Sequence, residues 1–138
     1  MKLDASAFVG GQTLVTALKD HATPIDCNGG RELFRQDECS NGIYIVLDGD
    51  VSLTMRSPDG DLVMDHLPAL PGSLLGLPAL VGGEGYSLSA TAQKGAHVSF
   101  VSADEFSRLM LQEPTIAVMI LKVLAAEVRT ARLSAANA

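Results

Sequence analysis

Short apolar segments separated by glycine-bearing turns run from about Thr23 to Ser102, and they restrict the chain to a β-rich fold. In Val51–Arg56 apolar and polar residues alternate, which is the period of a strand with one buried and one solvated face. Ile43–Leu47 is apolar at every position, as expected of a strand buried on both faces. Asp48-Gly49-Asp50 joins the two segments and is typical of a tight hairpin. The pattern predicts an all-β sandwich or roll.

The length of 138 residues fits one domain with one main core. We expect N-terminal helices over 1–22, a β-roll over 23–102 and C-terminal helices over 103–134. Gly10-Gly11 breaks the first segment, which predicts two short helices there. The roll is expected to repeat its alternation at Leu62 and Met64, and again at Ala96, Val98 and Phe100.

Helix signals begin where the strand pattern ends. Ser102 and Glu105 form a capping box, in which the serine accepts a backbone N–H and the glutamate reaches back to the cap. The capped helix is expected to end near Gln112. Pro114 is well placed as the first residue of a longer helix, which nothing interrupts before about Leu133.

This last helix is apolar on two sides. Ile116, Met119 and Val123 recur at helical spacing and are expected to pack on the β-body. A second stripe with heptad-like spacing consists of Ala117, Ile120, Leu124, Val128 and Ala131. The alternative is that the helix packs on both sides against its own domain. For so small a domain we favour a homodimer formed through the second stripe, and a different protein partner stays open.

Composition excludes several classes of function. The net charge is −6 and the basic residues are scattered, which disfavours DNA binding by this chain alone. The N-terminus lacks the pattern of a signal peptide and no apolar run reaches membrane-spanning length, so we expect a cytoplasmic protein that does not enter membranes.

Metal and cofactor chemistry is not indicated either. Cys27 and Cys39 are expected to be reduced thiols, although a redox switch between them stays open. Two thiols cannot complete a structural zinc or iron–sulfur site, and the three histidines stand far apart, so we expect neither metal nor cofactor.

Three stretches resemble the sensory domain of the Crp/Fnr family. Gly30–Gln36 is similar to the family's G-x-x-L-F-x-x-G strand and turn, Ile43–Val51 to its Y-I-V-L-x-G-x-V hairpin, and Pro71–Gly76 to its P-G-D-x-x-G approach to the ligand site. Asp37 stands where the family usually has glycine. The resemblance implies a cyclic-nucleotide-binding-like, double-stranded β-helical jelly roll of the cupin type with a long C-terminal helix.

The same resemblance implies where a ligand would bind. Nucleotide-binding members carry G-E-L/I-A, a loop and then R-S/T-A, whose backbone, glutamate and arginine hold the cyclic phosphate and ribose. Here Leu77 takes the place of the glutamate, and Ser87 or Leu88 that of the arginine. The candidate ligand residues of this degenerate cassette are Gly76, Leu77, Pro78, Ala79, Ser87, Leu88, Ser89, Ala90 and Thr91.

The cassette lacks charge, because no basic residue occurs between Arg56 and Lys94. We therefore expect no binding of cAMP or cGMP. Backbone groups near Ala79 and the hydroxyls of Ser87, Ser89 and Thr91 are suited to bind a neutral or weakly polar ligand. A packed turn that binds no ligand is an equal alternative. Tyr86 either offers a stacking surface or fills the core.

The expected function is that of a non-enzymatic regulatory or sensory module that signals through dimerisation or a partner. Complete family regulators continue into a winged helix-turn-helix, whereas this chain ends at Ala138, and we expect a stand-alone version. The first alternative is an isolated sensory domain of a Crp/Fnr regulator that binds a cyclic nucleotide. A cupin-like metal enzyme is the second, and it lacks the usual His-x-His pair.

Overall fold

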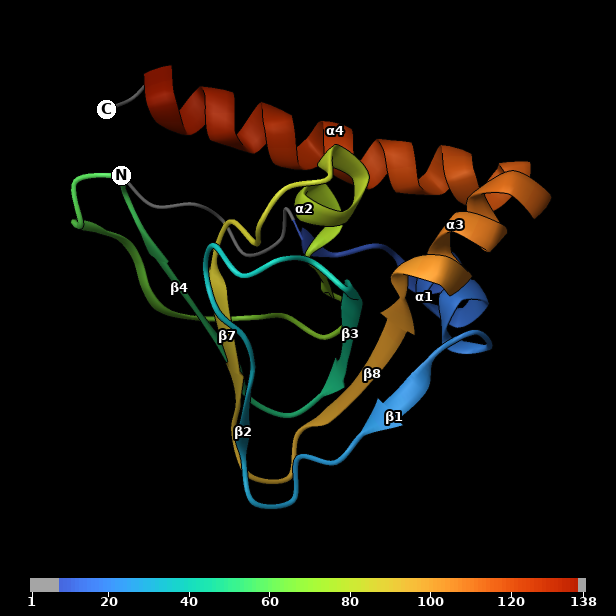
Figure 1. Ribbon diagram of the computed structural model, residues 1–138, viewed down its shortest axis with the longest axis horizontal. Coiled ribbons are helices and arrows are strands. Elements are labelled where there is room, and N and C mark those ends of the chain that lie inside the picture. Colours follow the sequence, from blue (N-terminus) through green and yellow to red (C-terminus); the bar gives the residue numbers. More distant parts are fainter. Residues whose placement is uncertain (1–7, 137–138) are drawn as a thin grey trace.

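The computed structural model describes the backbone of residues 8–136 and the side chains of residues 8–130 (Figure 1). Its body is a roll of two four-stranded antiparallel sheets. The first sheet has the order β1 (Thr23–Ile25), β8 (His97–Ser102), β3 (Gly42–Asp48) and β6 (Leu74–Leu75). The second has the order β2 (Arg31–Phe34), β7 (Ser89–Ala92), β4 (Val51–Arg56) and β5 (Leu62–Pro68). This architecture confirms the predicted jelly roll.

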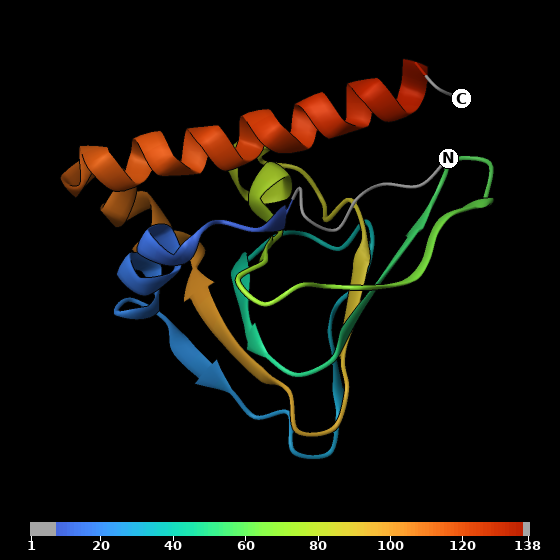
Figure 2. The same ribbon diagram turned by 180° about the vertical axis from the view of Figure 1, so that it is seen from behind.

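Four helices flank the roll. They are α1 (Gln12–Lys19), α2 (Leu77–Gly82), α3 (Ala103–Gln112) and α4 (Pro114–Ala136). In both views α4 lies across one end of the roll, with α2 directly beneath it (Figures 1 and 2). No single helix among the described residues has the length and hydropathy to cross a membrane, and α3 with the first part of α4 meets that test only as a pair bent by 116°.

Strand β3 separates two apolar cores. Tyr44 and Val46 point into the roll, where they join one cluster of buried side chains. Ile43 and Ile45 point the other way, into a second cluster with α1, α3 and α4. A strand buried on both faces has little room for polar residues, which is why the sequence from 43 to 47 is apolar throughout.

The capping prediction is confirmed for the serine and wrong for the glutamate. The Ser102 hydroxyl accepts the Glu105 backbone N–H at 3.2 Å, as a helix N-cap does. The Glu105 carboxylate turns outward instead of reaching back, and it contacts His21 Nδ1 at 2.9 Å and Arg108 Nη1 at 3.0 Å. The Arg108 guanidinium and the His21 ring thus compete successfully with the cap for this carboxylate.

The expected alternation fails in β5. Met64 is buried as predicted, but Leu62 is 46% exposed. The pairing of β4 with β5 shifts register on both sides of Met55, and such irregularities re-aim side chains. Strict alternation therefore does not persist through this hairpin.

At the N-terminus, α1 begins directly after Gly11, whose φ is +79°. The second of the two short helices predicted there is thus present. The first lies outside the described residues.

Candidate functional site

The degenerate cassette occupies the connection from β6 through α2 to β7. Gly76 precedes α2 with φ +97°, and a Cβ atom there would lie only 2.8 Å from Cε1 of Tyr86. Gly83 ends the helix with φ +68°. Both turns need backbone angles that side-chain-bearing residues rarely adopt, so the glycines fix where this short helix starts and stops.

The first half of the cassette points into apolar surroundings. Leu77, which stands where nucleotide-binding members have glutamate, is fully buried in the cluster between the roll and the helices. Ala79 packs into the roll interior, while Pro78 is exposed. No side chain of this half presents a polar group to the roll.

The second half of the cassette is equally apolar on its inner side. Of the two positions aligned with the missing arginine, Ser87 is exposed and Leu88 is buried inside the roll. Along β7, Ala90 points inward, whereas Ser89 and Thr91 lie on the opposite face. The Ser89 hydroxyl accepts the backbone N–H of Gln36 at 2.8 Å. The structure therefore does not bring these hydroxyls together at an internal ligand position.

Aromatic side chains fill the roll next to the cassette. Tyr86 stacks on Phe34 with ring centroids 4.1 Å apart, and Phe34 in turn lies 5.3 Å from Tyr44. Tyr44 continues the cluster to Phe100 at 4.9 Å. The Tyr86 hydroxyl lies 2.9 Å from Asn41 Oδ1 and 3.0 Å from the Gly42 carbonyl oxygen. Of the two roles considered for Tyr86, the structure shows the core-filling one.

The loop between β2 and β3 fastens Tyr86 in this position. The Asp37 N–H donates to the Tyr86 carbonyl at 2.8 Å, and the Tyr86 N–H donates to the Glu38 carbonyl at 2.9 Å. Gly85 lies so close that a Cβ atom there would come within 2.8 Å of the Asp37 carbonyl oxygen. Asp37 itself has φ +73°, the left-handed conformation for which the family's glycine is suited.

A cavity of about 330 Å³ remains beside the aromatic cluster. Its lining consists of Leu33, Phe34, Glu38, Cys39, Asn41, Tyr44 and Tyr86. Burial raises the pKa of the Tyr44 phenol, and the nearby Tyr86 and Glu38 act in the same direction. Among the lining residues the charged group is the Glu38 carboxylate, which disfavours an anionic ligand.

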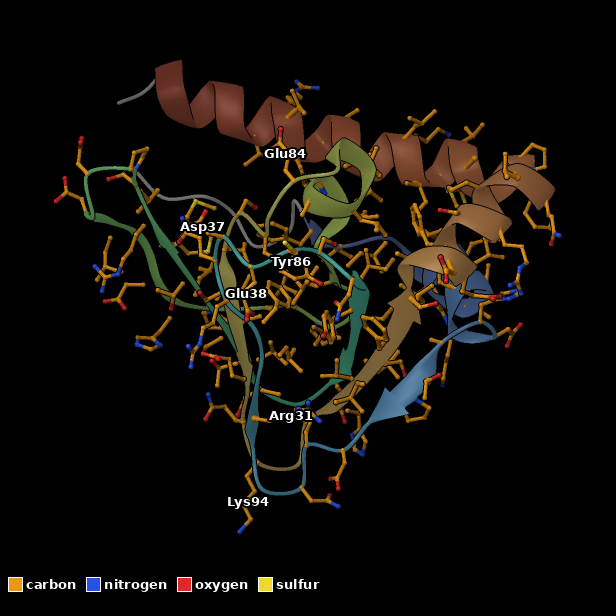
Figure 3. All side chains as sticks on the ribbon, in the orientation of Figure 1. Arg31, Asp37, Glu38, Glu84, Tyr86 and Lys94 are labelled. Atoms are coloured by element: carbon orange, nitrogen blue, oxygen red, sulfur yellow. The ribbon has the colours of Figure 1, made fainter. Side chains whose placement is uncertain are left out.

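Sequence reasoning missed one cation near this space. Arg31 stands opposite the buried Ala92 in the ladder, which places it on the inner face at the open end of β2, where its side chain is exposed (labelled in Figure 3). Its charge opposes the rise in the Tyr44 pKa. Period two gives no signal for this orientation, because Leu33 and Phe34 are both buried and the pairing of β2 with β7 shifts register between Glu32 and Phe34.

The long helix presents a different apolar stripe from the one predicted. Ile116 and Val123 are buried against the body and Met119 packs beside them, as expected. Ile120 is also buried in that cluster, whereas Leu121 is 63% exposed. Ala131 lies outside the described side chains. The exposed or half-buried apolar stripe is Ala117, Leu121, Leu124 and Val128, with spacings of four, three and four, and we call it the α4 seam.

Beside the α4 seam lies an apolar groove between α2, α3 and α4, with a volume of about 540 Å³. We call it the α2–α3–α4 groove. Its lining residues are Leu80, Val81, Phe106, Ser107, Met110, Leu111, Ala117, Ile120, Leu121 and Leu124. The groove and the seam thus share three residues and form one continuous apolar surface.

Potential metal ligands are dispersed. Within residues 8–130, no three side chains from His, Cys, Asp and Glu gather as a metal ion requires. Cys27 is a free buried thiol and Cys39 a free exposed one. Burial raises the pKa of the Cys27 thiol, which makes it a weak nucleophile.

The two-sheet roll, the cassette between β6 and β7 and the helix across one end together define a β-roll domain of the cyclic-nucleotide-binding type. Comparison with known families agrees, because the model of the cyclic nucleotide-binding domain matches residues 25–113. The chain belongs to this family. No curated protein matches the sequence.

Solved structures of several bacterial proteins share the fold. The catabolite activator protein of Thermus thermophilus is 22% identical with a TM-score of 0.76, and the match covers 90% of this chain and 58% of that one. The N-terminal domain of a transcriptional regulator from Streptomyces coelicolor A3(2) is 20% identical with a TM-score of 0.66, covering 90% and 85%. A cyclic nucleotide-binding-like protein from Brucella abortus is 27% identical with a TM-score of 0.56, covering 72% and 84%. The chain therefore spans little more than half of the Thermus protein.

Proposed function

We propose that this chain is a non-enzymatic, cytoplasmic regulatory module that does not bind cAMP or cGMP, and that it signals by dimerising through α4. The observation that supports the first part is the apolar, uncharged interior next to the cassette. Of Ser87 and Leu88, the two positions aligned with the arginine anchor, Leu88 is the one buried in the roll, in the same cluster as the stacked Tyr86 and Phe34. A cyclic phosphate placed there would lose its water without gaining a charged partner, which is unfavourable by several kcal/mol.

Isothermal titration calorimetry with cAMP and cGMP tests this part directly. We expect no specific heat with either nucleotide up to millimolar concentration. The companion titration uses Leu88→Arg, which restores a cation at the position that faces the roll. Specific micromolar binding by the wild-type chain would overturn the proposal.

One observation favours the alternative of a nucleotide-binding sensory domain, namely Arg31 on the inner face of β2. If this arginine replaces the missing anchor, Arg31→Gln abolishes nucleotide binding. Arg35→Gln is the matched control, because Arg35 follows the end of β2 and its guanidinium is paired with Glu32. The metal-enzyme alternative is tested by elemental analysis of the purified protein, where a stoichiometric metal would support it.

The second part of the proposal rests on the α4 seam. Its four-three-four spacing is the heptad period by which two helices interlock side chains. All four seam residues are apolar, and the basic residues Lys122 and Arg129 lie on another side of the helix. The same surface also suits a partner protein with an apolar helix, and we favour a second copy because it offers the same periodicity.

A further inference from the structure

The cavity of about 330 Å³ beside the aromatic cluster, which we call the aromatic cavity, has an apolar floor and a polar opening. Its lining residues fall into two groups by exposure. The buried group is Leu33, Phe34, Tyr44 and Tyr86, and the exposed group is Glu38, Cys39 and Asn41. The exposed group belongs to the loop between β2 and β3, so the cavity opens to solvent at this loop.

Aromatic rings are scarce in this chain and concentrated at this cavity. Of its four phenylalanines and two tyrosines, Phe34 and both tyrosines belong to the lining. Phe34 stacks on Tyr86 and is inclined by 32° to Tyr44, so the three rings form one continuous surface. The face of an aromatic ring carries negative electrostatic potential and attracts a cation within about 6 Å of its centre.

The Glu38 carboxylate adds a negative charge to the opening. Its Oε1 accepts the Arg35 backbone N–H at 2.7 Å, which holds the carboxylate next to the end of β2. Among the described side chains Glu38 forms no ion pair, and the Arg35 guanidinium pairs with Glu32 instead. The charge of Glu38 is thus available to a ligand.

No positive group offsets this charge within the lining. Arg31 is the cation that acts on Tyr44, but it does not line the cavity, and its side chain is exposed at the other end of β2 from Glu38 (Figure 3). A metal ion would need several ligands, and within residues 8–130 no three His, Cys, Asp or Glu side chains gather to hold one. The cavity therefore combines aromatic faces with one carboxylate, which favours an organic cation.

We propose that the aromatic cavity binds a small organic cation, with a quaternary or methylated ammonium group against the three rings and the Glu38 carboxylate as its counter-ion. The inference rests on the proposed function, because it assigns a ligand class to a roll that takes no cyclic nucleotide. Cation–π contact is an established way in which proteins recognise quaternary ammonium groups. A volume of about 330 Å³ lies near the lower limit of ligand-binding cavities, so the ligand is small.

Tyrosine fluorescence reports directly on this cavity, because the chain has no tryptophan and both its tyrosines belong to the lining. Choline chloride is the probe, titrated at constant ionic strength, and a saturable change in emission is expected. The matched neutral probe is the alcohol in which a carbon atom replaces the ammonium nitrogen of choline. The alcohol should bind about tenfold more weakly, because it lacks the attraction of a charge to the rings and to Glu38.

Glu38→Gln tests the counter-ion. Glutamine keeps an oxygen that can accept the Arg35 N–H, so the loop should keep its conformation, and choline should bind about fivefold more weakly. Glu84→Gln is the matched control, because Glu84 is also an exposed carboxylate but does not line the cavity (Figure 3). It should bind choline like the wild type. Circular dichroism verifies that both variants fold.

The exposed Cys39 thiol provides a second measurement at the opening of the cavity. Its rate of alkylation by iodoacetamide, an uncharged reagent, should fall in proportion to the occupied fraction as choline is added. Cys27 is buried and should contribute little to this rate. A rate that choline leaves unchanged would contradict the placement of the ligand at this opening.

The outcomes separate this inference from the proposed function. Equal affinity for choline and for the neutral alcohol overturns the preference for a cation, and equal affinity of wild type and Glu38→Gln overturns the role of the carboxylate. An absence of choline binding overturns the inference as a whole. None of these results bears on the nucleotide proposal, which the calorimetry with cAMP and cGMP decides.

Discussion

The ring of Tyr86 stacks on the ring of Phe34 with centroids 4.1 Å apart and planes inclined by 24°. Tyr86 comes from the cassette and Phe34 from β2, so a residue of the ligand-binding segment closes the space that the segment would serve. The domain keeps the family's roll, while aromatic side chains occupy the part of the interior next to the cassette and leave a cavity of about 330 Å³ beside them.

Replacing Tyr86 by alanine should destabilise the domain by about 3 kcal/mol, because the buried ring and its stacking contact with Phe34 are lost. Tyr86→Phe keeps the ring and removes only the hydroxyl contacts to Asn41 and Gly42, so a loss of about 1 kcal/mol is expected. Urea denaturation of both variants measures the difference. Equal losses would show that the stack contributes little.

The Glu127 carboxyl should make stability depend on pH. Both its oxygens are buried without a hydrogen-bond partner in the described part of the chain, and burial raises its pKa from 4.5 to about 8. Between these values the folded chain keeps a proton that the unfolded chain releases, so the free energy of unfolding falls as pH rises from about 4.5 to about 8. The slope approaches about 1.4 kcal/mol per pH unit.

Glu127→Gln removes this titration and should flatten the pH profile while raising stability at pH 8. Thermal unfolding between pH 5 and pH 9 is the measurement. Glu113, an exposed carboxylate between α3 and α4, is the control as Glu113→Gln. An unchanged slope in Glu127→Gln would mean that another group carries the pH dependence.

Left-handed backbone at Asp37 predicts a stabilising substitution. Asp37 has φ +73°, and an aspartate in this conformation is strained by about 1 kcal/mol relative to glycine. Glycine also makes the unfolded chain more flexible, which cancels part of this gain. Asp37→Gly should therefore raise the free energy of unfolding by several tenths of a kcal/mol. Glu38→Gly, at a neighbouring residue without positive φ, should destabilise instead.

The cap of α3 offers a local test of helix stability. Ser102→Ala removes the oxygen that accepts the Glu105 N–H and should destabilise the domain by about 1 kcal/mol. Ser107→Ala, an exposed change within the same helix, should have little effect on the melting temperature. Similar melting temperatures for the two variants would show that the cap is dispensable.

Leu121 and Ile120 are adjacent in sequence and should respond oppositely. Leu121→Ala should weaken dimerisation with little change in monomer stability, whereas Ile120→Ala should cost about 2–5 kcal/mol of stability because Ile120 is buried in the core. Sedimentation and urea denaturation together separate the two effects. Loss of dimer in Ile120→Ala at unchanged stability would restore the originally predicted stripe.

Much of the fold could be predicted from the sequence because the signals were local. Period-two alternation located β4, continuous apolarity located β3, and the serine and proline at the starts of α3 and α4 marked their first turns. The α4 stripe was misassigned at one position because apolar residues surround this helix. Only the packing of Ile120 on the body distinguished the buried side from the exposed one.

The interior of the roll was less predictable. Family motifs identified which charges are missing, at Leu77 and at Ser87 or Leu88, but they could not show that Tyr86 and Phe34 would meet, since 52 positions separate them in sequence. Glu105 pairs with Arg108 three residues further along α3, as helical spacing allows, but its contact with His21, in the turn after α1, joins residues 84 positions apart. Contacts between residues far apart in sequence therefore determine which side chains occupy the interior of the roll.

The central position of β8 has a consequence for folding. β8 lies between β1 and β3, and it pairs Thr23 with Phe100 and Gly42 with Ser102. The first sheet therefore lacks its middle strand until residue 102 has emerged from the ribosome. We expect the roll to close late and slowly during synthesis, with the apolar β3 segment exposed to chaperones in the meantime.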